Sequence, residues 1–549
     1  MSQPLSRRNF LQYVGWGSYA LMRDWSRLVQ AQAAPSNRPS APPPFFKPIA
    51  PSTEDQLILP DGYRYQLLAV WGDSLGSRGP YGEERVGSDC DFLAYFPIDA
   101  LQGGRNPNEG LLWINHENCK PLFASGYDGT RRTEEQVIQE KLQVGGTVLH
   151  IRREAGRWHV VKPSPYNRRL TALYPEIRLT GPVAERIPVV QGTLANCSGG
   201  RSPWWTALSC EENFHWFNRF ARDPDDDGYG WQAVPTQAID ETHYGWVVEV
   251  DPFGQLPPVK HSALGRFAHE NLAWRLGATG RLVCYMGDDS ANQYFYKYVS
   301  AEPLSSGMTR QEQRRLLERG TLYVADFLRQ VWIPLDVRRN RKLQEAGFRT
   351  QADVLLETRK AAKAAGATPL DRPEDCEVHP ADGSVYLALT NNVLHGNLFG
   401  QIIRLVEDND DAESESFRFE IFLVGGAPSG LACPDNLCFD RRGNLWVACD
   451  ISHVLLNRWA YRRFGNNGLY VVPTRGESAG DAFQFASGPV EAELTGPWFA
   501  EDYSCLFLSV QHPGEGTRSL DNPTSHWPHG GRDIPRSAVV VIDGFPAGW

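Results

Sequence analysis

The chain has 549 residues, and 55 Lys and Arg against 65 Asp and Glu give it a formal net charge of −10. Hydrophobic residues make up 41% and charged residues 22%, a composition typical of a globular protein with a large core. No apolar run approaches the roughly 18 to 20 residues of a membrane-spanning helix, and no long basic run offers a surface for nucleic acid. We therefore expect no membrane span and no nucleic acid as a specific partner.

The N-terminal segment is predicted to be an export signal. Residues 6–11 contain two adjacent arginines and are followed by a modestly apolar stretch and a small-residue site at 31–34. Charged residues inside the apolar stretch leave an ordinary basic helix as the alternative. We interpret residues 1–34 as a twin-arginine signal peptide, with the twin-arginine translocase as a partner and a periplasmic or extracellular destination. This route carries folded proteins, so it suits an enzyme that takes up a cofactor before export.

The rest of the chain is predicted to be a linker and one domain. Residues 35–55 are rich in Pro and Ser, which indicates an extended linker, and 56–549 are assigned to a single domain. Within it, Asp223 to Gly228 match the opening of a calcium-binding loop, but Val234 stands where a bidentate Glu is needed, so a calcium site and a plain acidic loop both stay open. Apolar residues at helical spacing predict a helical insertion at about 305–365, either capping the site or decorating an edge.

Six segments of the domain share one pattern. Each has polar residues, an apolar run, a turn that often contains Gly, a second apolar run and further polar residues; they begin at Asp89, Cys197, Glu270, Glu374, Asp435 and Pro497. In a β-hairpin the start of the first strand and the end of the second lie side by side. Six hairpins around an axis make a propeller whose blade ends converge on one mouth of a channel. We predict an all-β, six-bladed β-propeller-like fold with helical insertions.

This arrangement gathers a set of acids and one thiol at the mouth: Asp89, Asp91, Glu117, Cys197, Glu211, Glu212, Glu270, Asp288, Asp289, Glu374, Asp435 and Asp450. Carboxylates brought so close repel one another, and multivalent cations resolve that conflict. Oxygen-rich sites suit Ca²⁺, whereas a thiolate among carboxylates favours a transition metal such as iron. The alternative is that single acids form turns, but Glu is a poor turn residue. We interpret His116, His269 and His512 as structural or supporting residues rather than ligands.

The motifs resemble those of the PhoX-type alkaline phosphatases. The matching runs include Asn115-His116-Glu117, Asn196-Cys197-Ser198-Gly199-Gly200, Cys210-Glu211-Glu212-Asn213, Ala268-His269-Glu270, Gly287-Asp288-Asp289, Arg372-Pro373-Glu374, Pro434-Asp435-Asn436 and Gln511-His512-Pro513-Gly514-Glu515. The resemblance runs in order from about residue 61 to about residue 515 and includes the arginine pair. It implies a propeller-like fold with a mixed Fe³⁺ and Ca²⁺ cluster that hydrolyses phosphate monoesters outside the cytoplasm.

The resemblance also implies roles for single residues. Cys197 is expected to be the iron-ligating thiolate, Arg372 a phosphate-binding guanidinium and Glu374 a calcium ligand, and these three are the expected catalytic residues. The further expected metal ligands are Glu117, Glu211, Glu212, Glu270, Asp288, Asp289 and Asp435. One departure is Trp205, where the family usually has Gly, and we expect its bulk to reshape the rim of the pocket.

We therefore predict an exported, metal-dependent alkaline phosphatase, monomeric and acting on small phosphate monoesters. Two alternatives remain at this stage: a calcium-dependent propeller lactonase, which would need neither Cys197 nor Arg372, and a calcium-stabilised binding propeller without turnover. The chain has no G-x-x-x-x-G-K-[ST] loop, which disfavours a nucleoside-triphosphate motor.

Overall fold

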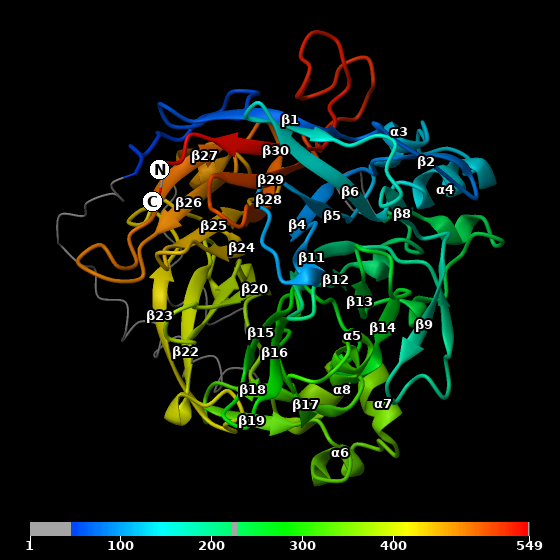
Figure 1. Ribbon diagram of the computed structural model, residues 1–549, viewed down its shortest axis with the longest axis vertical. Coiled ribbons are helices and arrows are strands. Elements are labelled where there is room, and N and C mark those ends of the chain that lie inside the picture. Colours follow the sequence, from blue (N-terminus) through cyan, green and yellow to red (C-terminus); the bar gives the residue numbers. More distant parts are fainter. Residues whose placement is uncertain (1–44, 222–227, 547, 549) are drawn as a thin grey trace.

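The computed structural model describes residues 45–221, 228–546 and 548, and it is a six-bladed β-propeller. The predicted twin-arginine signal at 1–34 and the acidic run Asp223 to Asp227 of the predicted calcium loop lie outside the described residues. Figure 1 looks down the propeller axis, with the strands β4, β11, β15, β20, β24 and β28 around the centre. The predicted fold class is confirmed.

Each blade is a mainly antiparallel sheet, and the strand named first for each blade below is the one nearest the channel. Blade 1 has β4 (Cys90–Pro97), β5 (Glu109–His116), β6 (Gly145–Glu154), β7 (Arg157–Val160) and β8 (Arg168–Leu170); blade 2 has β11 (Asn196–Arg201), β12 (Ala207–Glu211), β13 (Val247–Val250), β14 (Val259–His261), β9 (Glu176–Thr180) and β10 (Val189–Gln191). Blade 3 has β15 (Ala273–Leu276), β16 (Arg281–Gly287), β17 (Phe295–Pro303), β18 (Gly320–Asp326) and β19 (Val331–Pro334).

Blade 4 has β20 (Pro373–Val378), β21 (Val385–Leu389), β22 (Gln401–Glu407) and β23 (Phe417–Val424), and blade 5 has β24 (Pro434–Phe439), β25 (Leu445–Cys449), β26 (Gly468–Val472) and β27 (Phe483–Ser487). Blade 6 has β28 (Glu493–Phe499), β29 (Cys505–Gln511), β30 (Ala538–Asp543) and β1 (Arg64–Val70). The pairing of β1 with β30 closes the ring with strands from both ends of the sequence.

The blades are held together by apolar side chains on both faces of their sheets. All six residues of β30 and all five of β21 are buried, because each blade is sandwiched between two others and has no solvent face. Aromatic pairs join neighbouring blades, as where Tyr95 of blade 1 stacks on Phe507 of blade 6 with ring centroids 5.8 Å apart. The core therefore lies between the blades and leaves the channel free for polar groups.

The segment expected as a helical insertion at about 305–365 is only partly helical. It contains the short helices α5 (Arg310–Arg314), η6 (Arg315–Leu317), α6 (Arg341–Glu345), α7 (Gln351–Leu356) and α8 (Thr358–Ala365), but also β18 and β19 of blade 3. The charged runs on either side masked these strands in the sequence. None of its residues lines the large cavity described below, so this segment completes blade 3 and does not form the wall of that cavity.

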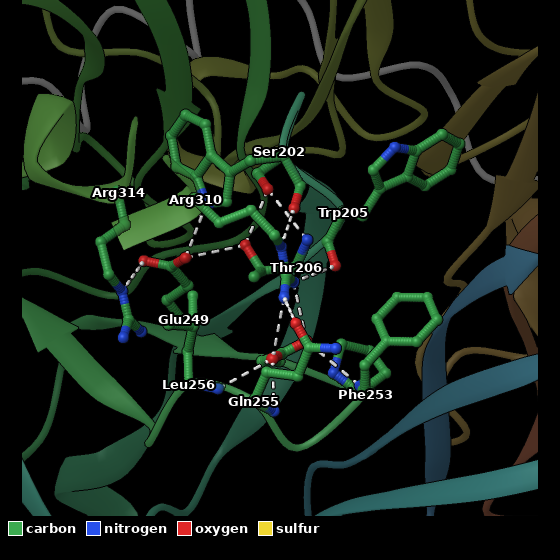
Figure 2. A network of polar contacts seen from close by, with 12 residues as sticks. Ser202, Trp205, Thr206, Glu249, Phe253, Gln255, Leu256, Arg310 and Arg314 are labelled. Carbon is green, nitrogen blue, oxygen red and sulfur yellow. Dashed lines mark hydrogen bonds and ion pairs between the residues drawn. The ribbon is translucent and has the colours of Figure 1, made fainter. Parts of the chain in front are cut away.

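Helix α5 is tied to blade 2 by a polar network, shown in Figure 2. Glu249 on β13 is buried and accepts hydrogen bonds from Thr206 Oγ1 at 2.8 Å and from Arg314 Nε at 3.3 Å. Arg310 donates to the backbone carbonyl of Trp205 at 3.3 Å. The Trp205 indole points away from this network (Figure 2).

The end of the predicted linker packs on the propeller instead of extending from it. Phe45 and Phe46 are buried, and Phe46 meets Phe485 edge-on with ring centroids 5.2 Å apart. Buried aromatic side chains of this kind contribute to stability, so the folded unit begins by residue 45. Among the described residues, no helix combines the length and the apolarity needed to cross a membrane.

Candidate metal centre

Each blade brings one buried ligand-type side chain to the same mouth of the channel. These six residues are called the inner ring: Asp91 on β4, Cys197 on β11, Glu270 just before β15, Glu374 on β20, Asp435 on β24 and Glu493 on β28. All six line one cavity of about 910 Å³. The hairpin repeat of the propeller therefore produces a ring of five carboxylates and one thiol.

Four of the ring residues sit in β-bulges. The register of the first two strands shifts between Cys90 and Leu93 in blade 1 and between Asn196 and Gly199 in blade 2, and blades 4 and 5 shift just after Pro373 and Pro434. A bulge bends the strand and re-aims a side chain, and bulges are frequent beside active sites. This local irregularity is what turns the ligands toward the channel.

The ends of the second strands supply further acids. Glu117 follows β5, Glu212 follows β12, Asp289 follows β16 and Asp450 follows β25, and all four line the same cavity. We call them the flanking acids. They lie beside the inner ring because the two ends of a hairpin meet opposite its turn.

Four overlapping groups of ligand atoms lie close enough together to hold metal ions. Within each group the atoms lie within 4.8 Å of one another; the groups are Asp91, Glu117 and Cys197; Cys197, Glu212 and Glu270; Glu270, Glu374 and Asp435; and Asp435, Asp450 and Glu493. Cys197 Sγ is 3.3 Å from an Asp91 oxygen and 3.4 Å from a Glu270 oxygen. Because neighbouring groups share a residue, the arrangement suits a cluster of ions rather than one isolated ion.

The electrostatics of the cavity favour bound cations. Burial, followed by the repulsion of neighbouring acids, raises the pKa of every inner-ring carboxyl well above its ordinary value. Burial and the Asp91 charge likewise raise the pKa of the Cys197 thiol. Two buried oxygens, Asp91 Oδ1 and Glu212 Oε1, have no hydrogen-bond partner among the described residues. Unpaired buried acceptors are costly, so this donor set fits metal ions, and the thiol fits a transition metal such as iron.

Arg372 is a cation of the cavity that contacts two of these acids directly. Its Nε and Nη2 donate to the two oxygens of Asp289 at 2.9 Å each, and Nη2 lies 3.0 Å from Glu374 Oε1. Burial disfavours the charge of Asp289, but the bidentate contact with Arg372 outweighs it and lowers the pKa of Asp289. Arg372 has φ 56°, in the left-handed region that costs a non-Gly residue about 1 kcal/mol or more. Its guanidinium is therefore fixed at the edge of the ring.

Two of the expected ligands point elsewhere. Glu211 Oε1 lies 2.6 Å from Lys260 Nζ, and both side chains are fully buried on the other side of β12. Asp288 accepts hydrogen bonds from Arg359 Nε at 3.0 Å through each of its oxygens. Successive side chains of a strand face opposite ways, so in these two pairs only the second member, Glu212 or Asp289, lines the cavity.

The histidines do not belong to the four ligand groups. His116 is held between Ser88 O at 2.9 Å and Thr147 Oγ1 at 2.7 Å, and His269 bonds Gly265 O at 2.9 Å. His512 lines the cavity 3.4 Å from Glu493; burial opposes its charge, but surrounding acids, Glu515 foremost, raise its pKa to about 9. It therefore adds positive charge to the wall of the cavity.

Sequence reasoning missed two residues of the centre. Glu493 is the first residue of β28 and begins blade 6, whereas the sequence pattern placed the beginning of that blade at Pro497. The turn before β29 could have corrected this prediction, because β28 lies before that turn and pairs with β29. Asp375 follows Glu374 and accepts hydrogen bonds from Ser198 Oγ at 2.8 Å and Leu437 N at 2.9 Å. Asp375 thus links blades 2, 4 and 5 directly behind the inner ring.

Trp205 does not lie at the rim of the cavity, contrary to expectation. It sits in the turn between β11 and β12, at the end of blade 2 away from the inner ring, and it is not among the cavity-lining residues. The guanidinium groups of Arg105 and Arg201 each lie 4.6 Å from its ring. The expectation failed because the turn end of a hairpin faces the opposite mouth of the channel.

Comparison with known proteins bears directly on this centre. A family model described as alkaline phosphatase PhoX matches residues 45–514. The structure of Pseudomonas fluorescens PhoX in complex with vanadate, a transition state analogue, is 31% identical, with a TM-score of 0.80 over 91% of this chain and 98% of that chain. A protein of unknown function from Dyadobacter fermentans is 9% identical, with a TM-score of 0.37 over 88% of this chain and 99% of that chain, too remote to carry an argument. A search of curated proteins gave no match.

Proposed function

Because this chain belongs to the PhoX alkaline phosphatase family and is therefore a phosphomonoesterase, we propose that it hydrolyses phosphate monoesters in the cavity at the inner ring. The observation that carries this proposal is the overlap of four ligand groups in one cavity. Membership of the family confirms the predicted phosphatase over the lactonase and binding-protein alternatives.

We assign the metals by the chemistry of the donors. The two groups that share Cys197 would hold iron, since a thiolate among carboxylates suits a transition metal. The two groups built only from carboxylates, which share Asp435, would hold calcium. On this assignment Glu270 serves both kinds of ion, because it belongs to one group of each kind.

The residues of the chain prepare the cavity for a dianionic ester. When bound, the metal ions supply positive charge for the phosphoryl oxygens and activate an oxygen nucleophile. Asp289 orients Arg372 through its bidentate contact, and among the described residues no partner takes up Arg372 Nη1. Nη1 can therefore donate to a phosphoryl oxygen in a charge-assisted hydrogen bond. Arg372 binds and orients the ester, and Glu374, 3.0 Å from Arg372 Nη2, couples it to the ring.

A direct test combines turnover with metal analysis. Purified protein should release p-nitrophenol from p-nitrophenyl phosphate at alkaline pH with added Ca²⁺, lose that activity in EGTA, and show no turnover of a lactone. Elemental analysis should find iron and calcium together, and Cys197→Ala should lose iron while retaining calcium. Full activity of a protein with calcium alone, or iron retained by Cys197→Ala, would refute the metal assignment.

We also propose that the enzyme is exported as a folded monomer by the twin-arginine pathway. The support is the arginine pair in residues 6–11 and the small-residue site at 31–34. Replacing Arg7 and Arg8 by Lys should keep phosphatase activity in the cytoplasmic fraction, whereas the unaltered chain delivers it outside. Unchanged delivery of the double variant would contradict this route.

A further inference from the structure

The strand that carries Cys197 is held from the neighbouring blade. Cys197 and Ser198 lie in the β-bulge of β11, where the ladder with β12 is interrupted. Buried backbone carbonyls outside the ladder need another donor. One side chain serves both: Asn115 Nδ2 donates to Cys197 O at 2.7 Å and to Ser198 O at 2.9 Å. Because Asn115 lies on β5, this clamp joins blade 1 to the ligand strand of blade 2.

The Asn115 amide is engaged on both sides. Its oxygen accepts hydrogen bonds from Trp113 Nε1 and from Ser209 Oγ, each at 2.7 Å, and Asn115 is fully buried. Both amide hydrogens and both lone-pair directions are thus used, so the side chain has one orientation. Any other rotation breaks four hydrogen bonds in a dry environment, where unpaired polar groups are costly.

The network continues away from the cavity through buried side chains. Asn196 Nδ2 donates to Ser209 Oγ at 2.8 Å, and Thr193 Oγ1 lies 3.0 Å from Asn196 Oδ1 and 2.8 Å from Glu211 Oε1. It ends at the ion pair of Glu211 with Lys260. Glu211 therefore ends this network on the side of β12 that faces away from the cavity.

We propose that Asn115 is a positioning residue that fixes the Cys197–Ser198 peptide, and through it the Cys197 thiolate, for iron binding. This inference rests on the proposed role of Cys197 as an iron ligand. Cys197 Sγ belongs to two ligand groups at once, 3.3 Å from Asp91 and 3.4 Å from Glu270. A thiol shared by two groups tolerates little displacement of its backbone, so the clamp decides whether both groups form.

The test replaces the donor while keeping the size of the side chain. Asn115→Asp replaces the Nδ2 donor by a carboxyl oxygen, an acceptor, which then faces the carbonyl oxygens of Cys197 and Ser198. Relative to wild type, we expect the affinity for iron to fall about 10- to 100-fold, the range typical when a partner of a metal ligand is removed, and iron loss to a chelator to be faster. The thiolate-to-iron absorption band should shift or weaken, and kcat should fall with little change in KM. Ser209→Ala, which removes one bond to Asn115 Oδ1, should change the same readouts less and serves if Asn115→Asp does not fold.

Asn466→Asp is the matched control. Asn466 is 1% exposed and its Nδ2 donates to the carbonyls of Glu54 and Gly488 at 3.0 Å each, so it is an equally buried clamp away from Cys197. Equal iron loss and an equal band in the Asn115 and Asn466 variants, or wild-type values in Ser209→Ala, would overturn the positioning role alone. A wild-type protein without iron, or iron retained by Cys197→Ala, would instead refute the proposed function and this inference with it.

Discussion

Two adjacent glutamates, Glu211 and Glu212, should respond to the same substitution in opposite ways. Glu211→Gln leaves Lys260 buried without its counter-charge, since the two charged groups are 2.6 Å apart and fully buried. The folded protein then avoids the charge by releasing the lysine proton. With an ordinary lysine pKa of 10.5, that release costs about 3.4 kcal/mol at pH 8. This agrees with the roughly 3 to 5 kcal/mol measured when one partner of a buried pair is removed.

The pH dependence of this cost has a definite sign. The unfolded chain keeps the lysine proton up to about pH 10.5, whereas the folded variant has lost it, so unfolding takes up a proton and stability rises with pH. The destabilisation should shrink by about 1.4 kcal/mol between pH 8 and pH 9. Denaturant unfolding at both pH values measures it. Adding Lys260→Met to Glu211→Gln should restore most of the stability, because no buried charge is left unpaired.

Metal analysis separates the two positions. Glu211→Gln should retain its iron and calcium at pH 8 once folded, while Glu212→Gln should lose iron with little change in the unfolding midpoint of the metal-free protein. If Glu211→Gln lost metal in the same proportion as Glu212→Gln and kept its stability, the ion-pair interpretation would be refuted.

Three further outcomes test other parts of the structure. Arg372→Lys keeps the charge but loses the planar fork, so kcat/KM for p-nitrophenyl phosphate should fall about tenfold or more in protein that remains folded; unchanged kinetics would count against the phosphate contact. After both metals have been removed, the inner-ring carboxyls have a pKa raised by burial and by one another, so the metal-free protein should be most stable near pH 5 and lose stability as the pH rises through those values. Urea midpoints at pH 5 and pH 8 check this, and no pH dependence would contradict it. Trp205→Gly should leave kcat/KM unchanged, because Trp205 lies outside the cavity; an altered substrate range would place it at the rim after all.

The sequence was sufficient for the blades because their signal is repetitive. Apolar runs separated by turns and bounded by polar residues predict a hairpin wherever they occur, and six of them predict a propeller. It was insufficient where one residue decides the outcome. Glu211 and Glu212, like Asp288 and Asp289, differ only in which face of the sheet they occupy, and a shift of one position exchanges them.

The bulges are a second feature that the sequence does not reveal, even where the ligand itself was expected. A bulge inserts an extra residue without any required residue type, so the register that points Asp91, Cys197 and Glu374 inward is fixed by contacts between blades. Asn115 is such a contact, and it acts across a sequence separation of 82 residues from Cys197. The prediction that Trp205 lies at the rim was wrong for a different reason. It followed the position of Trp205 in a motif and ignored that this residue lies at the turn end of its hairpin.

The closure of blade 6 has a consequence for biogenesis. Since β1 pairs with β30, and Glu493 stands on β28 of the same blade, a nascent chain cannot complete the inner ring until nearly the whole polypeptide has left the ribosome. On the proposed metal assignment, the ligand group Asp435, Asp450 and Glu493 is therefore completed only near the end of translation or after it. This order is consistent with an export route that carries folded proteins, such as the one proposed for residues 1–34.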